Sequence, residues 1–408
     1  MKKTSMDPTA ASAAPTIDTE ALGLDEGALL LVRRALAQVP GAGTLHARGR
    51  AANWELHLTA WCRQQGHAIQ TSTLPDGTCE AIITRGPWAE GRWRDALATG
   101  HSQSPAPSAK PEWGLAARGA TVEAGSPAFN FTLSNRDELW ATTADEIYRQ
   151  GVAAQWDPQA AIDWDAPFEL DPAIEAAVVQ VMTFLVENEN AALIVPARHL
   201  GQLHPHYREV QQVLALQCAD EARHVEVFTR RLGLRGHAPM LSTAGGQASL
   251  RTLLQAPDFS SATFLLSVLG EGTFVNLLNF LCEFGPDPVT RQICRLAARD
   301  EARHVAFGMA HLKYRLSVEP DYLARLQNAI EQRHEDLAPT SGLNEEVFDA
   351  LVLLAAGSLT PAAIARGHAA AQQLKLDMAA GRKSRLLHLG FPADQAQRLA
   401  DMHTRNFM

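Results

Sequence analysis

The chain has 408 residues, of which 46% are hydrophobic and 20% charged, which is ordinary for a globular protein and allows two domains. Its net charge of -9, with both signs interspersed, argues against nucleic acid as the main partner. No run approaches the roughly 18 apolar residues of a membrane helix, so we expect no membrane association. The start of the chain lacks the apolar segment of a signal peptide, and the five cysteines form no C-x-x-C pair, which favours a cytoplasmic protein with reduced thiols.

The first third of the chain has short, mixed elements. Residues 1–15 are rich in Ala, Ser, Thr and Pro, which predicts a disordered N-terminus. Residues 16–90 predict a small α+β domain. In it, "EGALLLVRRALAQV" and "NWELHLTAWCRQQG" are amphipathic helices, and "HAIQTSTLPDGTCEAIITRG" is two strands around a Pro-Asp-Gly turn. Residues 91–128, with "HSQSPAPSAKPEWG" near their centre, predict a linker.

Residues 129–408 predict a helical domain. From Pro172 onward, apolar positions recur at helical spacing. The breaks "HPH", "APD", "GPDP" and "EPD" delimit four long helices at about 172–200, 206–232, 259–284 and 288–317, and further helices fill 321–380. Gly245-Gly246 is interpreted as a turn. The expected fold class is mainly α, a four-helix bundle with additional helices, preceded by the small α+β domain.

The string Asp-Glu-Ala-Arg-His-Val occurs twice, at 220–225 and 300–305. Residues i and i+3 lie on one face of a helix, so Glu221 with His224, and Glu301 with His304, each present a carboxylate and an imidazole together. One such pair arises easily by chance, but two identical copies on successive helical hairpins do not. A carboxylate-bridged two-metal site in a bundle needs these two pairs and one further glutamate from each of the other two helices.

The two further glutamates are predicted from hairpin geometry. In an antiparallel hairpin, two ligands meet at one level only if they are about equally far from the turn. Glu189 and Glu271 precede the two motif glutamates by 32 and 30 residues, and the midpoints of these intervals are Pro205 and Pro286. Both midpoints are turn prolines, which favours these two residues as the missing ligands.

The context of each glutamate adds to this choice. Glu271 is the only acidic residue in "ATFLLSVLGEGTFVNLLNFL", and a lone buried carboxylate is costly unless it is paired or metal-bound. Glu189 competes with Glu187, since residues two apart point in different directions and only one of them can face the bundle axis. We prefer Glu189. Pro196 is expected to kink or end this helix above the site.

An aspartate precedes each motif glutamate. Metal-bound histidines usually give their second ring N–H to a carboxylate, which fixes the tautomer and the ring orientation. Asp220 and Asp300 are candidates for this role across the bundle, with Arg223 and Arg303 balancing their charge. For the arginines, an ordinary surface Asp-Arg pair is an equally good interpretation.

These motifs carry a resemblance. "GEGTFVNLL" followed by "DEARHVAFG", and "ENAALI" followed by "DEARHVEVF", resemble the catalytic subunits of bacterial multicomponent di-iron monooxygenases. More broadly, residues 135–317 are similar to the ferritin-like di-iron oxygenases, including arylamine N-oxygenases. The resemblance implies two irons that activate O₂, with Fe/Fe preferred and Mn/Fe open. The matching ligand positions are Glu189, Glu221, His224, Glu271, Glu301 and His304.

The sequence departs from each subtype of that family. Val275 stands where the monooxygenases have an active-site threonine, with Thr273 on another face of the helix. Phe228 replaces the radical tyrosine of ribonucleotide reductase subunits, and Ala297 replaces the additional histidine of the arylamine N-oxygenases. No subtype fits completely.

The N-terminal domain carries a second resemblance. "IDTEALGLDEGALLLVRRALAQVPGAGTL" and "ELHLTAWCRQQGH" resemble the SirA/TusA-like sulfur carriers. The persulfide-holding Cys-Pro pair of those carriers is replaced by Leu24 and Asp25, and Cys62 lies in the second helix. The resemblance therefore implies a docking or dimerisation module without sulfur chemistry.

The resulting hypothesis is an O₂-dependent non-haem di-iron oxygenase or oxidase. It would hydroxylate or N-oxygenate a small organic substrate, with electrons from a separate reductase or ferredoxin. Such bundles often pair, so a homodimer is left open. Two alternatives remain: a ferritin- or rubrerythrin-like metal oxidase or peroxidase, and a non-catalytic scaffold that docks through its N-terminal domain. Candidates for an apolar cavity wall are Phe228, Phe264, Phe274, Val275 and Phe307.

Overall fold

The computed structural model describes residues 14–86, 95–337 and 345–402. The chain forms two compact units, one with residues up to 98 and 120–127, the other with residues 99–119 and 128 onward. The segment predicted as a linker is therefore divided between the two units. Within its described part, β5 (Leu97–Ala98) pairs antiparallel with β6 (Thr121–Val122). Nearly all of the N-terminus predicted as disordered lies outside the described residues.

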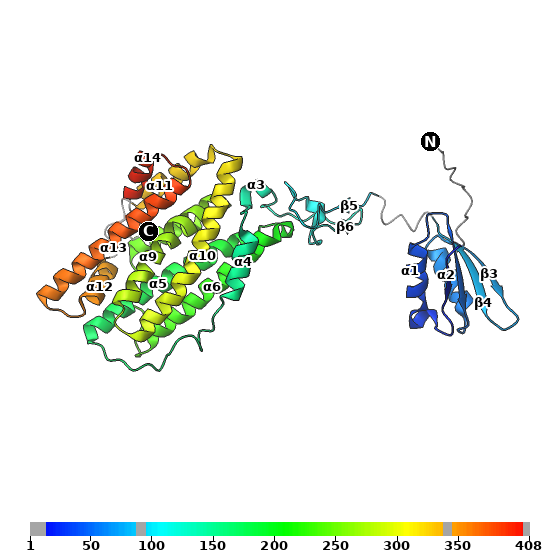
Figure 1. Ribbon diagram of the computed structural model, residues 1–408, viewed down its shortest axis with the longest axis horizontal. Coiled ribbons are helices and arrows are strands. Elements are labelled where there is room, and N and C mark those ends of the chain that lie inside the picture. Colours follow the sequence, from blue (N-terminus) through cyan, green and yellow to red (C-terminus); the bar gives the residue numbers. More distant parts are fainter. Residues whose placement is uncertain (1–13, 87–94, 338–344, 403–408) are drawn as a thin grey trace, which may run out of the picture. The chain divides into compact units, whose positions relative to one another are not determined.

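The N-terminal unit is a four-stranded sheet with two helices (Figure 1). The strand order is β1-β2-β4-β3, with β1 parallel to β2 and the other neighbours antiparallel. The elements are β1 (Thr16–Asp18), η1 (Leu24–Ala28), α1 (Leu29–Ala37), β2 (Thr44–Gly49), α2 (Trp54–Gln64), β3 (Ala68–Thr73) and β4 (Cys79–Thr84). The β3–β4 hairpin around Pro75-Asp76-Gly77 confirms the turn predicted from the sequence. The kinship to sulfur carriers stays a prediction.

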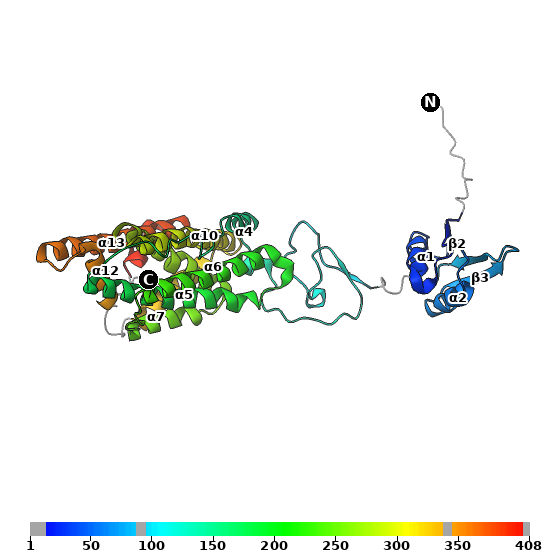
Figure 2. The same cartoon turned by 90° about the horizontal axis from the view of Figure 1, so that it is seen from below.

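The second unit is helical (Figures 1 and 2). Short elements precede its long helices: η3 (Pro111–Trp113), α3 (Arg136–Leu139) and α4 (Ala144–Ala153). The bundle consists of α5 (Pro172–Leu200), η4 (Pro205–Tyr207), α6 (Arg208–Gly233), α7 (Ala244–Leu254), α8 (Phe259–Thr263), η5 (Phe264–Glu271), α9 (Gly272–Phe284) and α10 (Pro288–Val318). After it come α11 (Tyr322–Leu337), α12 (Glu345–Ala356), α13 (Pro361–His388) and α14 (Ala393–Asp401).

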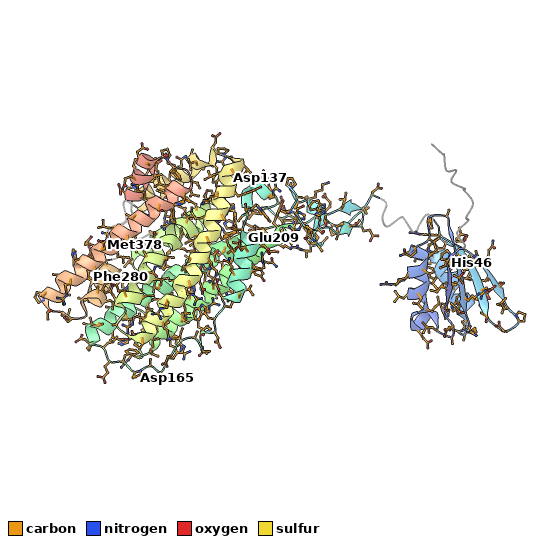
Figure 3. All side chains as sticks on the ribbon, viewed as in Figure 1. His46, Asp137, Asp165, Glu209, Phe280 and Met378 are labelled. Carbon is orange, nitrogen blue, oxygen red and sulfur yellow. The ribbon has the colours of Figure 1, made fainter. Side chains whose placement is uncertain are left out.

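Four long helical elements form the bundle core: α5, α6, the continuous run α8-η5-α9, and α10. In it α5 packs along α6 and α9 packs along α10, while α12 covers α5 and α13 covers α9. Figure 3 labels Phe280 of α9 and Met378 of α13, which belong to one apolar core. The mainly α fold, a ferritin-like four-helix bundle with additional helices and a small sheet region, confirms the predicted fold class.

The helix starts follow from their capping residues. Asp171 accepts a hydrogen bond from the Ala173 N–H, and Asp287 accepts one from the Thr290 N–H. Each aspartate is followed by a proline, at 172 and 288, whose fixed φ suits the first helical position. The two predicted starts at these prolines are therefore confirmed.

One local prediction is wrong and another is contradicted in part. Helix α5 spans Pro172–Leu200, which confirms the predicted range, and it does not end at Pro196, because Pro196 is buried in the bundle and packing there outweighs the lost backbone hydrogen bond. Gly245 and Gly246 lie in the first turn of α7 and not in a turn between helices. The hydroxyl of Thr243 caps α7 by accepting a hydrogen bond from the Gly246 N–H, which compensates for the low helix propensity of glycine.

Two helices, Pro172–Leu200 and Phe259–Phe284, are long and apolar enough to cross a membrane by length and composition, although no uninterrupted apolar run predicted this. The bent pair α12 and α13 would be a third candidate. In the two long helices, 72% and 83% of the apolar window is buried inside the bundle. Packing against neighbouring helices thus accounts for their apolar character.

Candidate metal centre

The structure brings all six predicted ligand residues together in the bundle core. The first glutamate comes from α5, one Glu-x-x-His pair from α6, the second glutamate from the end of η5, and the other pair from α10. Every one of these side chains is buried, with at most 4% of the residue exposed. Glu187, the alternative to Glu189, is only half-buried and stands outside the cluster. The six are Glu189, Glu221, His224, Glu271, Glu301 and His304.

The ligand atoms form two overlapping groups. One contains Glu189, Glu221, His224 and Glu301, and the other contains Glu221, Glu271, Glu301 and His304. Within each group, the ligand atoms lie within 4.8 Å of one another. Glu221 and Glu301 belong to both groups, so each can bridge two ions, whereas the other four residues each serve one ion. The arrangement is that of a two-metal site.

The histidine rings are held by carboxylates on both sides. His224 Nδ1 lies 3.1 Å from Glu221 and 3.6 Å from Glu189, while its Nε2 lies 3.2 Å from Asp300. Nδ1 therefore faces the ligand cluster, and Nε2–H can donate to the aspartate on the opposite motif helix.

His304 repeats this arrangement in the other direction. Its Nδ1 lies 3.0 Å from Glu221 and 3.3 Å from Glu301, and its Nε2 lies 3.3 Å from Asp220. Each aspartate thus orients the histidine of the other copy of the motif, across the bundle, which is where the sequence analysis placed them.

The two motif arginines tie the aspartates together. Arg223 Nη2 lies 2.5 Å from Asp220 and 2.8 Å from Asp300, and Arg303 Nη2 lies 3.2 Å from Asp220 and 2.5 Å from Asp300. These are not isolated surface pairs, because each guanidinium contacts both aspartates and both aspartates are buried. The structure therefore favours the charge-balancing interpretation over the surface one.

Two further residues of this network were missed by the sequence analysis. The Gln155 side-chain amide donates to Asp220 (2.8 Å), and the Trp156 indole N–H donates to Asp300 (2.8 Å). The Arg223 guanidinium also lies 4.6 Å from the Trp156 ring centroid, within cation–π range. No spacing rule links these residues to aspartates 65 and 144 positions away.

Burial and repulsion between like charges shift the pKa values of the ligand carboxylates. Burial raises the pKa of Glu189 and of Glu271 well above the ordinary glutamate value, and the charges of Glu221 and Glu301 raise it further. Burial acts in the same direction on Glu221, but His304 and His224 hold the pKa of that carboxyl below its usual range. Without a metal, burial therefore favours the neutral form of the two outer glutamates, Glu189 and Glu271.

Unpaired oxygens test whether the residues fit metal ions. One oxygen of each of Glu189, Glu221, Glu271 and Glu301 is buried and accepts no hydrogen bond. Two of these oxygens, on Glu221 and Glu301, lie 3.0 and 3.4 Å from histidine Nδ1 atoms without forming a hydrogen bond. Buried polar atoms are almost always satisfied, so four such oxygens in one cluster need an explanation. Two divalent cations would satisfy all four, and carboxylate with imidazole suits iron or manganese. The donor set fits.

The backbone around Glu271 is a π-helix, in which hydrogen bonds join residues five apart. The Gln217 amide donates to Glu271 Oε1 (2.8 Å) and orients this carboxylate. Thr273, one of the positions compared with the monooxygenase threonine, gives its hydroxyl hydrogen to the Leu269 carbonyl (2.7 Å), so its donor is engaged within the helix. Val275 offers no hydroxyl.

A small cavity of about 20 Å³ adjoins the ligands Glu189, Glu271 and Glu301. This volume suits one molecule of the size of water or O₂. The wall is completed by Asn188, Ala192, Leu253, Leu266, Gly270 and Phe274. Of the five residues proposed as a cavity wall, only Phe274 lines it, and Phe228, Phe264 and Phe307 are packed in the core.

An Asp300→Asn variant tests the orienting role of the aspartates. Asparagine keeps the shape and the acceptor oxygen but removes the charge, so we expect metal affinity to fall about 10- to 100-fold. Competition with a chromophoric chelator measures this. Asp145→Asn, at an exposed position of α4, is the matched control, and equal affinity in both variants would contradict the assigned role.

No family model matches the chain, and no curated protein matches it. Among solved structures, it is similar to a variant of an R2-like ligand-binding oxidase with an aerobically reconstituted Mn/Fe cofactor, at 17% identity and a TM-score of 0.49, over 61% of this chain and 94% of that one. It is also similar to a protein with aldehyde deformylating oxidase activity from Synechococcus, at 16% identity and a TM-score of 0.41, over 56% and 96% of the two chains. The metals that this site can hold follow from the chemistry of its own carboxylate and imidazole side chains.

The bundle and its donor set define a class. A glutamate from each of two helices and a Glu-x-x-His pair from each of the other two is the ligand pattern of the ferritin-like carboxylate-bridged di-metal proteins. This chain has that fold and that pattern, with its two ligand groups sharing Glu221 and Glu301.

Proposed function

We propose that this protein is an O₂-dependent oxidase or oxygenase that uses two iron ions, or one manganese and one iron, to oxidise a small organic molecule. The single observation that carries the proposal is the pair of buried ligand groups sharing Glu221 and Glu301. A bridged pair of redox metals supplies the electrons that O₂ reduction requires.

The chain's own residues would perform the remaining tasks. Glu221 and Glu301 would hold the ions together, and Asp220 and Asp300 would fix the orientation of the two imidazoles. The outer glutamates, whose pKa values are raised by burial, would exchange protons as the site is loaded.

The cavity beside the ligands supports O₂ chemistry over hydrolysis. Its wall is made largely of apolar groups, among them Leu253, Leu266 and Phe274, which would keep bulk water from ions bound there. A substrate larger than O₂ needs these walls to move, so we propose that substrate binding displaces the α7 side of the cavity. We propose that the substrate is hydroxylated or N-oxygenated. A separate reductase or ferredoxin would supply the electrons.

The experiment is a single-turnover test on the full chain. Protein loaded anaerobically with two equivalents of Fe(II) should consume O₂ rapidly and develop the near-ultraviolet absorption of oxidised, carboxylate-bridged iron. Metal-free protein is the control. Absence of metal binding or of O₂ consumption would overturn the proposal. Continued uptake of iron far beyond two ions per chain would instead support the ferritin-like alternative.

A further inference from the structure

Two buried arginines and one half-buried arginine lie outside the metal centre, on helices α11 and α13. Arg333 comes from α11, and Arg382 and Arg385 come from α13. Arg333 is 6% exposed, Arg382 is 3% exposed, and Arg385 is half-buried. Burial lowers the pKa of Arg382 to about 9, and the charges of the two neighbouring arginines add to this shift. Arg382 and Arg385 are three residues apart on α13 and so lie on one face of that helix.

These arginines have few partners. Arg333 donates one hydrogen bond to the Ser249 hydroxyl (2.9 Å), and Arg382 donates one to the Ala400 carbonyl (3.5 Å). The Nε of all three, and the Nη2 of Arg382 and Arg385, are buried without any partner. Among the ion pairs of the described residues, none joins a carboxylate to any of the three.

Another buried arginine of this bundle, Arg231, forms ion pairs with carboxylates. Arg231 is fully buried, but it lies 2.8 Å from both Glu175 and Asp287. Burying a charge is costly unless a countercharge accompanies it. Arg231 has two carboxylate partners, whereas the described residues offer the three arginines none, so an anion from outside the described residues would compensate their charge.

The arginine cluster borders the metal centre. A side chain at Gly272, which directly follows the ligand Glu271, would lie 2.5 Å from the Arg385 Cζ, so that guanidinium rests on the backbone of α9. On α7, Ser249 contacts Arg333, and Leu253, one turn further, lines the cavity beside the ligands. Ser249 and Leu253 are separated by about 6 Å along the axis of α7.

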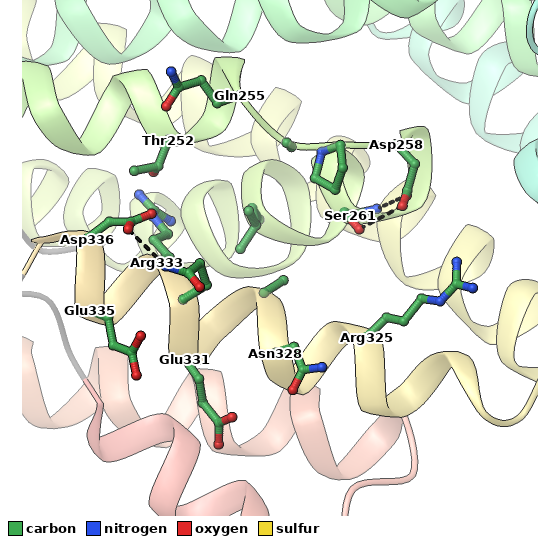
Figure 4. Close-up of a pocket in the computed structure, with 15 residues that line it drawn as sticks. Thr252, Gln255, Asp258, Ser261, Arg325, Asn328, Glu331, Arg333, Glu335 and Asp336 are labelled. Atoms are coloured by element: carbon green, nitrogen blue, oxygen red, sulfur yellow. Dashed lines mark hydrogen bonds between the residues drawn. The ribbon is translucent and has the colours of Figure 1, made fainter.

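Arg333 also gives the cluster access to solvent. It lines an open cleft of about 710 Å³ between α7, α8 and α11, and Figure 4 shows its side chain reaching from α11 toward α7. The acidic groups of the cleft are Asp258, Glu331, Glu335 and Asp336, and its other cation is Arg325. Asp258 caps α8, and Glu331 is paired with Arg398 (2.7 Å). Of the three arginines, Arg333 is the one that lines this cleft, so the cleft offers a route from solvent to Arg333.

We propose that Arg333, Arg382 and Arg385 bind the anionic head group, a carboxylate or a phosphate, of the organic substrate. Arginine is suited to both because its planar fork matches their oxygens. The remainder of the substrate would extend along α7 toward the cavity at the ligands. The identification of the anion as the substrate rests on the proposed oxidase function, whereas anion binding itself does not require metal.

The test uses the full chain freed of metal by a chelator. Isothermal titration compares octanoate, octyl phosphate, inorganic phosphate and the neutral octanamide. We expect octanoate or octyl phosphate to bind, octanamide not to bind, and Arg382→Met to weaken binding at least 10-fold. Arg325→Met, which removes an exposed cation of the same cleft, should leave the affinity unchanged. Which of the two organic anions binds more tightly identifies the head group.

A second readout separates ligand binding from a structural role. Arg382→Met removes an uncompensated buried charge, so we expect the ligand-free variant to melt about 3 °C higher than the parent. A structural arginine would lower the melting temperature instead, and Arg333→Met provides an independent repeat.

The outcomes distinguish this proposal from the oxidase function. No binding of either organic anion, equal loss in the Arg325→Met control, or binding of inorganic phosphate alone would overturn the head-group site. Protein that consumes O₂ but binds no organic anion retains the oxidase function without this site. Protein that binds the anions but fails to consume O₂ retains the site and loses the oxidase function.

Discussion

A Glu301→Ala variant is expected to retain less than one metal ion per chain, where the parent binds two. Glu301 belongs to both ligand groups, so its loss removes one carboxylate from each ion at once. Glu221 would then be the one residue shared by both ligand groups, and each group would offer fewer protein ligands than in the parent. Elemental analysis after anaerobic loading and desalting measures the count, and O₂ consumption should fall to the level of metal-free protein.

The matched control for this variant is Glu187→Ala. Glu187 is a glutamate of the same bundle, two residues from the ligand Glu189, but it is half-buried and outside the ligand groups. This control variant should bind two ions with unchanged affinity. If Glu187→Ala loses metal while Glu301→Ala keeps it, the ligand assignment is wrong.

An Arg231→Met variant is expected to lose about 3–5 kcal/mol of unfolding free energy, because it leaves two carboxylates buried without their countercharge. Arg231 is fully buried and lies 2.8 and 3.0 Å from the two oxygens of Glu175 and 2.8 Å from Asp287. The pairing joins α6 to α5 and to the start of α10. Urea unfolding of the metal-free protein, followed by circular dichroism, measures the change.

Arg208→Met serves as the comparison, because the Arg208 side chain is 53% exposed and only approaches Glu209 at 3.6 Å. We expect a change within about 0.5 kcal/mol for this variant. Equal effects at positions 208 and 231 would contradict the structural role of the buried ion pairs. Arg231→Met and Arg382→Met should shift stability in opposite directions, although both replace a buried arginine with the same residue.

The six ligand residues were predictable because their positions follow from spacing along the chain. Glu-x-x-His spacing places two ligands on one helical face, and prolines such as Pro205 mark the turns about which the remaining ligands are symmetric. The start of α10 was predictable in the same way, since an aspartate followed by a proline is a strong helix-start signal. These features depend on neighbours within a turn or a hairpin.

The surroundings of the site were not predictable because they depend on contacts between distant segments. Trp156 reaches Asp300 across 144 positions, and Ser249 meets Arg333 across 84. No periodicity encodes such pairs. Pro196 and Gly245 were misinterpreted for the opposite reason, since local propensity suggested breaks where packing and a threonine cap sustain helices.

The direction in which the Glu271 side chain points depends on the π-helical stretch Phe264–Glu271, which ends at this residue. A π-helix uses more residues per turn than an α-helix, so the residues before and after it are out of phase by comparison with a regular helix. Deleting a single residue there would let the stretch relax to an α-helix, and the rotation lost with that residue would be largely offset, because each α-helical residue turns the chain by more than a π-helical one. A change that made Phe264–Glu271 α-helical without removing a residue would instead rotate Glu271 relative to Phe264, so the π-helical conformation itself helps set the direction in which this carboxylate points.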